Sequence, residues 1–199
     1  MKTSARSILA LCSLGLLSGN VALQADDVTD TIEEAVKAYN EGDFVVASQS
    51  LETATQLIKQ KRAEGLTKFL PQAPSGWEAM DATSQAASAS FFGGGVTAER
   101  EYTKGGSSVT IKILTDSPMM QGVMMMMGNP MFANADGGKL IRLKGQRAIV
   151  KYAADDKSGS VNVVVGGAIL VEIDGNECTE DDLMAFANAI DYPGLAGAL

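Results

Sequence analysis

Apolar residues recur at helical spacing in two successive segments near the start of the chain. The first segment opens with the capping pattern of Asp30 and Glu33 and stops at Gly42. The second begins after Asp43, a good helix cap, and ends near Gly65. The spacing predicts two amphipathic helices that form an antiparallel hairpin over residues 26–66. The apolar stripes are Ile32, Ala35, Val36 and Tyr39 in the first helix and Phe44, Ala47, Leu51, Ala54 and Ile58 in the second.

After a proline-containing linker over residues 67–76, alternation of apolar and polar residues replaces the helical spacing. Two alternating segments, 96–102 and 108–116, flank Gly105-Gly106, a two-residue turn of the kind that hairpins favour. Pairing Lys104 with Ser107 puts Glu99 opposite Lys112, and their opposite charges support this register. The same register predicts the pairs Tyr102 with Val109, Arg100 with Ile111 and Ala98 with Ile113. Further strands are predicted over residues 139–143, 146–153, 160–165 and 168–173.

A last helix closes the chain, with Thr179 as its cap and Pro193 as a residue that prevents its continuation. Its predicted buried stripe is Leu183, Phe186, Ala187 and Ile190. The order of elements predicts the α+β class: an N-terminal α-helical hairpin followed by an antiparallel β-meander sheet with helices on one face. We expect the α+β domain to span residues 77–199.

Residues 1–25 have the features of a secretory signal peptide. Lys2 and Arg6 precede an apolar run of ten residues from Ile8 to Leu17, and the small residue Ala25 marks the expected cleavage point. Because a membrane-spanning helix needs about 20 apolar residues, we expect export to the periplasm and no transmembrane segment after cleavage. Cleavage removes two basic residues and no acid, so the net charge changes from −8 to −10. Such a charge disfavours nucleic acid as a partner.

The composition restricts the chemistry of the chain. It contains no histidine, which excludes a Ser-His-Asp triad, a Cys-His dyad and a histidine-ligated zinc ion within the chain. Only Cys178 remains after the predicted cleavage, and the acids around it, including Glu177 and Asp182, oppose thiolate formation. We therefore expect a buried, inert thiol. The acidic turns at 155–156 and 174–182 lack the ligand pattern of an EF-hand, so we expect solvated turns there.

Seven of the ten methionines lie between Met119 and Met131, a density that sets this segment apart. Ser117-Pro118 at its start and Asn129-Pro130 at its end predict a helix between them. Packing in the core is the favoured interpretation, because methionine fills irregular gaps. The other two remain open: an adaptable surface for a partner or acyl chain, formed by Met120, Val123, Met124, Met127 and Met131, or a Cu(I) site with thioether ligands from Met120, Met124, Met127 and Met131.

Parts of the sequence resemble known families. The stretch from Ala38 to Phe44, with the alanines that follow, resembles one tetratricopeptide unit, but only one copy is present. The Gly-Trp entry at residues 76–77, the hairpins and the capped helix at 179–187 resemble small Mog1/PsbP-like α+β domains. The Gly-Trp, Tyr-Thr-Lys-Gly and Asn-Pro-Met segments are similar to a proteobacterial family of uncharacterised periplasmic proteins. These resemblances imply an α+β envelope domain and supply no catalytic residues.

These patterns together predict a periplasmic binding or scaffold protein that is not an enzyme and holds no cofactor. Its expected partner is an envelope protein or an acyl chain, and its oligomeric state stays open. Two alternatives remain: a periplasmic Cu(I)-binding protein that uses the Met119–Met131 cluster, and a hydrolase built on carboxylates alone from among the 24 acidic residues.

Overall fold

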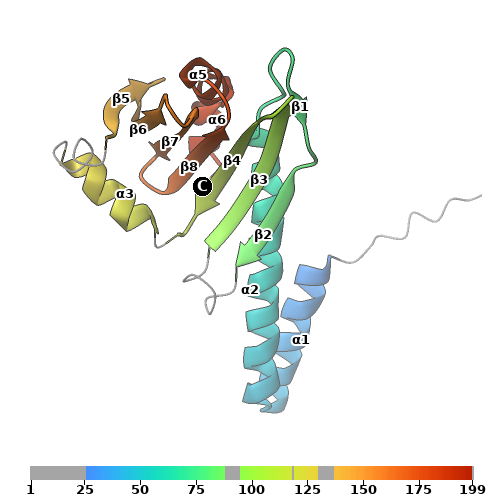
Figure 1. The fold of residues 1–199 in the computed structure, drawn as a ribbon. Coiled ribbons are helices and arrows are strands. Elements are labelled where there is room, and N and C mark those ends of the chain that lie inside the picture. Colours follow the sequence, from blue (N-terminus) through green and yellow to red (C-terminus); the bar gives the residue numbers. More distant parts are fainter. Residues whose placement is uncertain (1–25, 88–94, 118, 130–136, 199) are drawn as a thin grey trace, which may run out of the picture.

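The computed structural model describes residues 26–87, 95–117, 119–129 and 137–198, and it confirms the α+β class. Within these ranges an eight-stranded antiparallel sheet follows two N-terminal helices (Figure 1). The helices are α1 (Asp27–Glu41), α2 (Phe44–Leu66), α3 (Met119–Gly128), α5 (Glu180–Ala189) and α6 (Tyr192–Ala196), with a short 3-10 turn at Thr67–Phe69. The strands are β1 (Glu78–Ala79), β2 (Thr83–Ala87), β3 (Gly95–Lys104), β4 (Ser107–Thr115), β5 (Lys139–Leu143), β6 (Gln146–Ala153), β7 (Ser158–Val165) and β8 (Ile169–Asn176).

The predicted helical hairpin is present, but its first helix begins earlier than the capping pattern of Asp30 and Glu33 indicates. Asp26 is the actual cap, because its carboxylate accepts a hydrogen bond from the Val28 amide at 3.3 Å. Gly42 ends α1 with φ of 83°, a left-handed conformation that glycine adopts without strain. Asp43 then caps α2 by accepting from the Val46 amide at 3.1 Å, as expected. The connection is therefore only two residues long.

The β3–β4 hairpin has the predicted register. Tyr102 lies opposite Val109, Arg100 opposite Ile111, and Ala98 opposite Ile113. Glu99 faces Lys112 across the strands, and their charged groups are 3.9 Å apart. The two-glycine turn and the cross-strand charge pair therefore identified this hairpin correctly.

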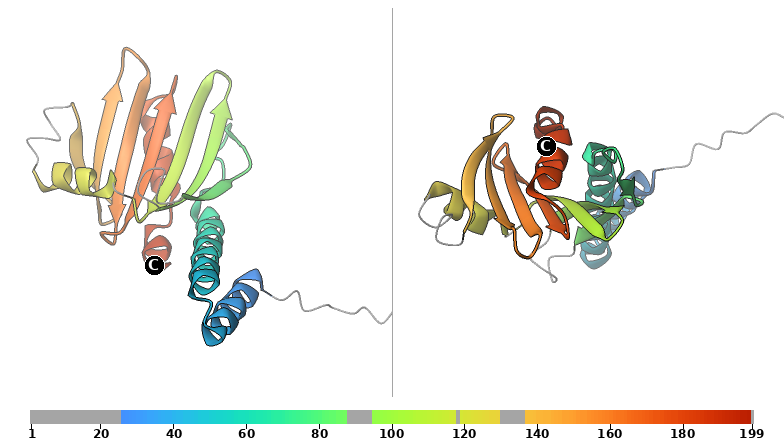
Figure 2. Two further views of the ribbon diagram at one scale, coloured as in Figure 1. Left: turned by 90° about the horizontal axis from the view of Figure 1, so that it is seen from below. Right: turned by 45° about the horizontal axis from the view of Figure 1, so that its top comes forward.

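The structure corrects the predicted meander in one respect. The strand order is β1-β3-β4-β8-β7-β6-β5, with β2 also paired to β3. Strands β5 to β8 form a meander, but β4 pairs with β8 and not with β5. The connection between β4 and β5, which contains α3, therefore crosses from the middle of the sheet to its far edge (Figure 2).

The main core lies between one face of the sheet and the helices α2, α5 and α6. Phe186 of α5 occupies its centre, with ring centroids 5.0 Å from Trp77 and 4.7 Å from Tyr102. Ala63 and Leu66 at the end of α2 belong to the same core. The last turns of α2 are therefore anchored to the sheet, while its first half and α1 extend beyond it (Figure 1).

The opposite face of the sheet is covered in part by α3, which corrects the expectation that all helices lie on one face. Met127 packs there with Ile149, Val164 and Leu170 in a second apolar cluster. Figure 2 shows α3 across the strands on one side and α5 with α6 on the other. The sheet is thus buried on both faces at this end.

Helix α5 packs on the sheet where two glycines lie opposite each other on β7 and β8. Gly159 of β7 pairs with Gly175 of β8. A Cβ atom on Gly175 would overlap the side chain of Leu183, and one on Gly159 would overlap the Lys151 carbonyl oxygen and contact Leu183 tightly. Because both positions lack side chains, Leu183 is fully buried against the backbone of the two strands. The glycine pair therefore allows the close approach of α5 to the sheet.

Candidate functional site

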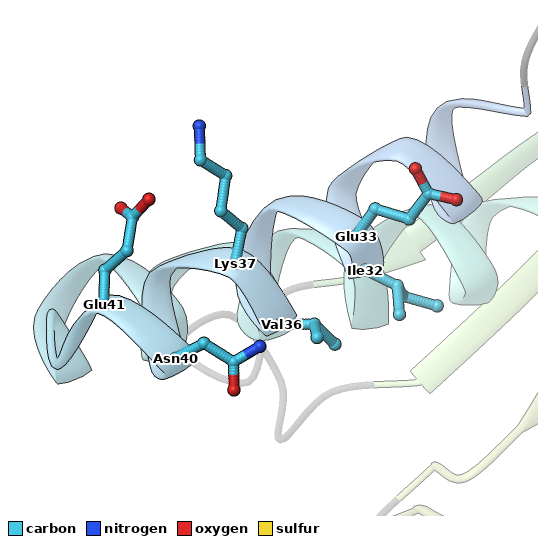
Figure 3. Close-up of a pocket in the computed structure, with 6 residues that line it drawn as sticks. All are labelled: Ile32, Glu33, Val36, Lys37, Asn40 and Glu41. Atoms are coloured by element: carbon cyan, nitrogen blue, oxygen red, sulfur yellow. The ribbon is translucent and has the colours of Figure 1, made fainter.

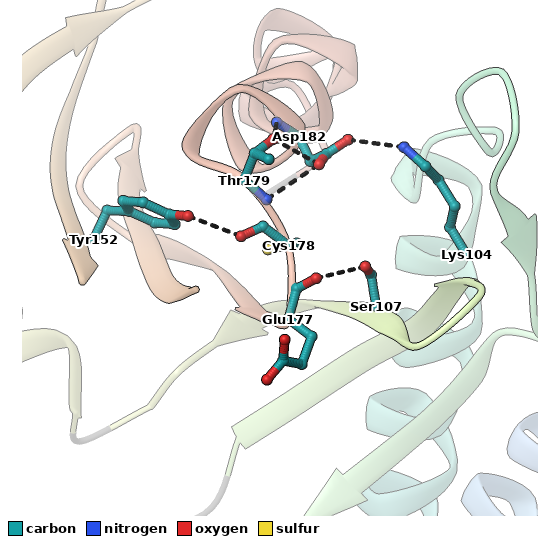
Figure 4. Close-up of polar contacts among 7 residues, drawn as sticks. All are labelled: Lys104, Ser107, Tyr152, Glu177, Cys178, Thr179 and Asp182. Atoms are coloured by element: carbon teal, nitrogen blue, oxygen red, sulfur yellow. Dashed lines mark hydrogen bonds and ion pairs between the residues drawn. The ribbon is translucent and has the colours of Figure 1, made fainter. Parts of the chain in front are cut away.

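The connection between β8 and α5 is held by side chains from three other strands or turns (Figure 4). The Ser107 hydroxyl donates to the Glu177 carbonyl at 2.5 Å, and the Tyr152 hydroxyl donates to the Cys178 carbonyl at 2.9 Å. Thr179 and Asp182 form a reciprocal capping box, and the Lys104 ammonium lies 3.4 Å from the Asp182 carboxylate. These contacts fix the beginning of α5.

Cys178 lies inside this connection and is 3% exposed, which confirms that the thiol is buried. Burial raises the pKa of the Cys178 thiol, and the nearby negative charge of Asp182 raises it further. Because the thiolate is the nucleophilic form, both effects oppose reactivity. The surroundings of Cys178 are those of a structural residue.

The methionine-rich segment forms α3, and its side chains have very different surroundings. Met127 is 3% exposed in the second apolar cluster, and Met120, Val123 and Met126 are half-buried at the border of that cluster. Met124 and Met125 are exposed, at 37% and 69%. The helix is thus packed on the sheet along one stripe, as the core-packing interpretation expects for Met127.

The predicted methionine face is corrected at Met124, which is 37% exposed and does not join the second apolar cluster, while Met131 lies outside the described residues. Almost every position of this segment is apolar, so the sequence pattern does not define which stripe is buried. A Cu(I) site needs several sulfur atoms directed at one point. Met127 packs with Ile149, Val164 and Leu170, whereas Met124 is 37% exposed and is not part of that cluster, so apolar carbon atoms surround the Met127 side chain.

The sheet face on which α3 packs is polar where α3 does not cover it, and it carries two neighbouring acids there. Burial raises the pKa of Glu172, and the nearby Asp174 raises it further, while Lys112 lowers it. Burial also raises the pKa of Asp174, again opposed by Lys112. The two acids are two positions apart on β8, and their side chains lie on the same face.

A hollow of 480 Å³ opens beside these acids, lined by Lys151, Ser160, Asp174 and the glycines of β7 and β8. Among the described lining residues, Asp174 is the single carboxylic acid. Hydrolysis of a glycoside by carboxylates uses a pair of them on either side of the bond. The described residues of this hollow supply one, so its geometry does not favour the hydrolase alternative. Elsewhere in these ranges, no group of three or more Cys, Asp or Glu residues is arranged to hold a metal ion.

The seam between α1 and α2 is lined by small residues. Ala35 and Ala38 of α1 are buried, and so are Ala47, Ser50 and Ala54 of α2. Small side chains allow the two helix axes to approach closely. Consequently most of the large apolar residues of the two helices are not fully buried, with Val28 at the start of α1 as the exception.

Those large residues lie on the outside of the hairpin. Within the described ranges, seven of the eleven exposed large hydrophobic residues belong to α1 and α2, so the exposure is concentrated there. The predicted stripes are thereby corrected: their alanines are buried, whereas their larger members are not. The exposed residues are Ile32 (40%), Val36 (55%), Tyr39 (64%), Phe44 (63%), Val45 (68%), Leu51 (53%) and Ile58 (44%).

A shallow hollow of 440 Å³ lies along α1 on this part of the molecule. In Figure 3, Ile32 and Val36 point to one side of α1, whereas Glu33, Lys37 and Glu41 point to another. The described lining comes from a single helix, so this is a surface depression and not an enclosed ligand cavity. Its apolar side continues into the exposed stripe of the hairpin.

Comparisons of the chain with protein families, with curated proteins and with solved structures found no match. Among the described residues, no helix is both long enough and apolar enough to cross a membrane.

From the sequence, a partner surface was expected on the methionine-rich segment of α3, and none was expected on the hairpin of α1 and α2. A signal was present, because Phe44, Leu51 and Ile58 are spaced by seven residues, the spacing of helices that pack on other helices. The alanines between them, Ala47 and Ala54, have the same spacing. Two adjacent apolar stripes on one helix indicate two contacts, and α1 occupies only the alanine stripe.

Proposed function

We propose that this chain is an exported, non-catalytic binding or scaffold protein and that its helical hairpin is the surface that binds protein. The observation that carries this proposal is the run of large apolar side chains exposed on α1 and α2. Soluble monomers rarely expose connected apolar patches larger than a few hundred Å², and larger patches mark sites of interaction. The helical spacing of the exposed residues suits a helical partner.

The structure of the hairpin supports a role in binding more than a role in packing. Ala35, Ala47 and Ala54 already fill the seam between α1 and α2, so the larger residues do not stabilise the hairpin from within. They are held by a helix whose end is anchored in the main core through Ala63 and Leu66. Because the helix that carries this apolar surface is already fixed, binding to it requires little further loss of conformational entropy.

Affinity capture from the cell envelope with matched variants tests this proposal. Leu51→Glu puts a charge in the middle of the exposed stripe, whereas Gln49→Glu puts the same charge at an exposed polar position on the opposite side of α2. We expect the wild-type chain and Gln49→Glu to retain the same proteins, identified by mass spectrometry, and Leu51→Glu to lose them. Equal capture by all three chains, each shown to be folded by circular dichroism, contradicts the proposal.

The export part of the proposal rests on Lys2, Arg6 and the apolar run of residues 8–17. N-terminal sequencing of the protein from the envelope fraction should find a start near Asp26. An intact N-terminus at Met1 on the soluble protein contradicts export with cleavage.

A further inference from the structure

The exposed stripe is continuous from one helix of the hairpin to the other. Tyr39 at the end of α1 and Phe44 at the start of α2 make an edge-to-face ring contact, with centroids 5.7 Å apart. This contact joins the stripe of α1, formed by Ile32, Val36 and Tyr39, to the stripe of α2, formed by Phe44, Leu51 and Ile58. Ile32 and Leu51 are each seven residues from the ring pair, so they lie at the same height in the antiparallel hairpin.

The size of the stripe is that of one half of a stable interface. Its six large side chains are between 40% and 64% exposed. Since a large side chain has on the order of 150–250 Å² to bury, they leave roughly 600 Å² uncovered. Stable interfaces bury about 800 Å² on each partner, including a polar rim. A surface of this area, with the polar residues beside it, fits one helical hairpin of equal length.

The charges of the two helices are complementary. The described part of α1 carries five acids and Lys37, whereas α2 carries Lys59, Lys61 and Arg62 against two acids. Within one copy, the Lys61 ammonium lies 2.8 Å from the Asp26 carboxylate. If two hairpins pack with α1 of each on α2 of the other, the same acidic and basic ends meet between copies. Packing α1 on a second α1 would bring like charges together.

We propose that the occupant of the hairpin stripe is a second copy of this chain, so that two hairpins form a four-helix bundle. The arrangement has two-fold symmetry, with α1 of each copy on α2 of the other and Ile32 of one copy beside Leu51 of the second copy. This inference rests on the proposed function, because it names the protein that the hairpin binds.

Sedimentation velocity over a range of protein concentrations tests the association, with protein purified after expression from the full sequence. The wild-type chain and Gln49→Glu should convert from monomer to dimer as concentration rises. Leu51→Glu should raise the dimer dissociation constant by roughly 100-fold or more, because a charge would be buried at the centre of the interface. Circular dichroism checks that all three chains are folded.

Cysteine cross-linking tests the arrangement. A mixture of Ile32→Cys and Leu51→Cys chains should form a disulfide-linked pair under mild oxidation more readily than either variant alone. The native thiol of Cys178 does not interfere, because it is 3% exposed. Faster linking of Leu51→Cys to itself than to Ile32→Cys overturns the proposed packing of α1 on α2.

The outcomes separate this inference from the proposed function. A wild-type chain that stays monomeric, or a dimer that Leu51→Glu does not weaken, overturns the second copy as occupant. If capture from the envelope still depends on Leu51 in that case, the proposed binding function stands with a different partner. If neither association nor capture depends on Leu51, both proposals are overturned.

Discussion

The sheet and the projecting hairpin place their large side chains in opposite ways. In the sheet region, Tyr102, Phe186 and Tyr192 are fully buried, and polar residues occupy the uncovered face. In the hairpin, alanines are buried, whereas Tyr39 and Phe44 are more than 60% exposed. The first arrangement stabilises a fold, because burial of large apolar groups is the main favourable contribution to folding. The arrangement in the hairpin leaves large apolar groups uncovered, so their burial can favour association with another protein.

Helix α2 takes part in both arrangements. Its last turns place Ala63 and Leu66 in the main core, and its first turns expose Phe44 and Leu51. One end of α2 is therefore fixed by the main core, while the apolar side chains at its other end are not buried in the monomer. Along α2, the buried end therefore stabilises the fold, and the exposed beginning is available for contact.

The largest expected effect comes from leucine-to-alanine changes in the two regions. Leu183→Ala should lower the free energy of unfolding by about 2–5 kcal/mol, because Leu183 of α5 is fully buried against β7 and β8. Leu51→Ala should change it by less than about 0.5 kcal/mol, because Leu51 is 53% exposed. Urea unfolding at a low protein concentration, where the chain is monomeric, measures both. Equal losses for the two variants would remove the distinction between the regions.

A similar comparison is available within α3. Met127→Ala should cost about 2–5 kcal/mol, whereas Met127→Leu should cost less than about 1.5 kcal/mol, because leucine keeps the volume and the apolar character. Met125→Ala is the matched control and should be nearly neutral, since Met125 is 69% exposed. Thermal unfolding checks the order of the three variants. A neutral Met127→Ala would mean that α3 does not stabilise the sheet.

A smaller, pH-dependent effect is expected at the beginning of α5. Burial acts to raise the pKa of Asp182, but hydrogen bonds from Thr179 and Lys104 outweigh it, and the pKa is lower than usual. A lowered pKa in the folded state means that the carboxylate stabilises the fold above the unfolded pKa of about 4 and loses this contribution as pH falls below it. Asp182→Asn should therefore cost about 1 kcal/mol at neutral pH, and the difference from wild type should shrink in acid. Urea unfolding at several pH values measures it, and a loss that does not change with pH contradicts the role of the charge.

The smallest effect is expected at Glu172, and it has the opposite sign. Burial and the neighbouring Asp174 raise the pKa of Glu172, so its charged form is disfavoured in the folded state. The cost is present above the raised pKa and disappears as pH falls through it. Glu172→Gln should stabilise the protein at neutral pH by less than about 0.5 kcal/mol and make no difference in acid. Destabilisation at neutral pH would show that the contact with Lys112 outweighs burial.

The local parts of the fold were predictable from the sequence. Gly105-Gly106 and the pair Glu99 and Lys112 determine the β3–β4 register through neighbouring residues alone. The cap Thr179 determines the start of α5 in the same way. The pairing of β4 with β8 was not predictable, because it joins strands more than 50 residues apart and no short pattern reports it.

The candidate surface was harder to predict for a different reason. Ala35 and Val36 are both apolar and adjacent, so the pattern does not tell which of them faces α2. Side-chain volume decides this, because the close packing of the two helices admits alanine and excludes the larger residues. In α3 the repeated methionines remove the polar positions that would mark the solvent side. In both α1 and α3, side-chain packing determines which apolar residues are buried, and the periodicity of the sequence does not describe that packing.

The glycine pair of β7 and β8 has a consequence for how the chain reaches its final structure. A slip of one residue in the pairing of these strands turns every side chain to the other face. Such a slip would put Ser158 or Ser160, or Asp174 or Asn176, where Gly159 and Gly175 now leave space for Leu183. Helix α5 would then be unable to dock. The glycine pair therefore makes the docking of α5 depend on the correct register of β7 and β8.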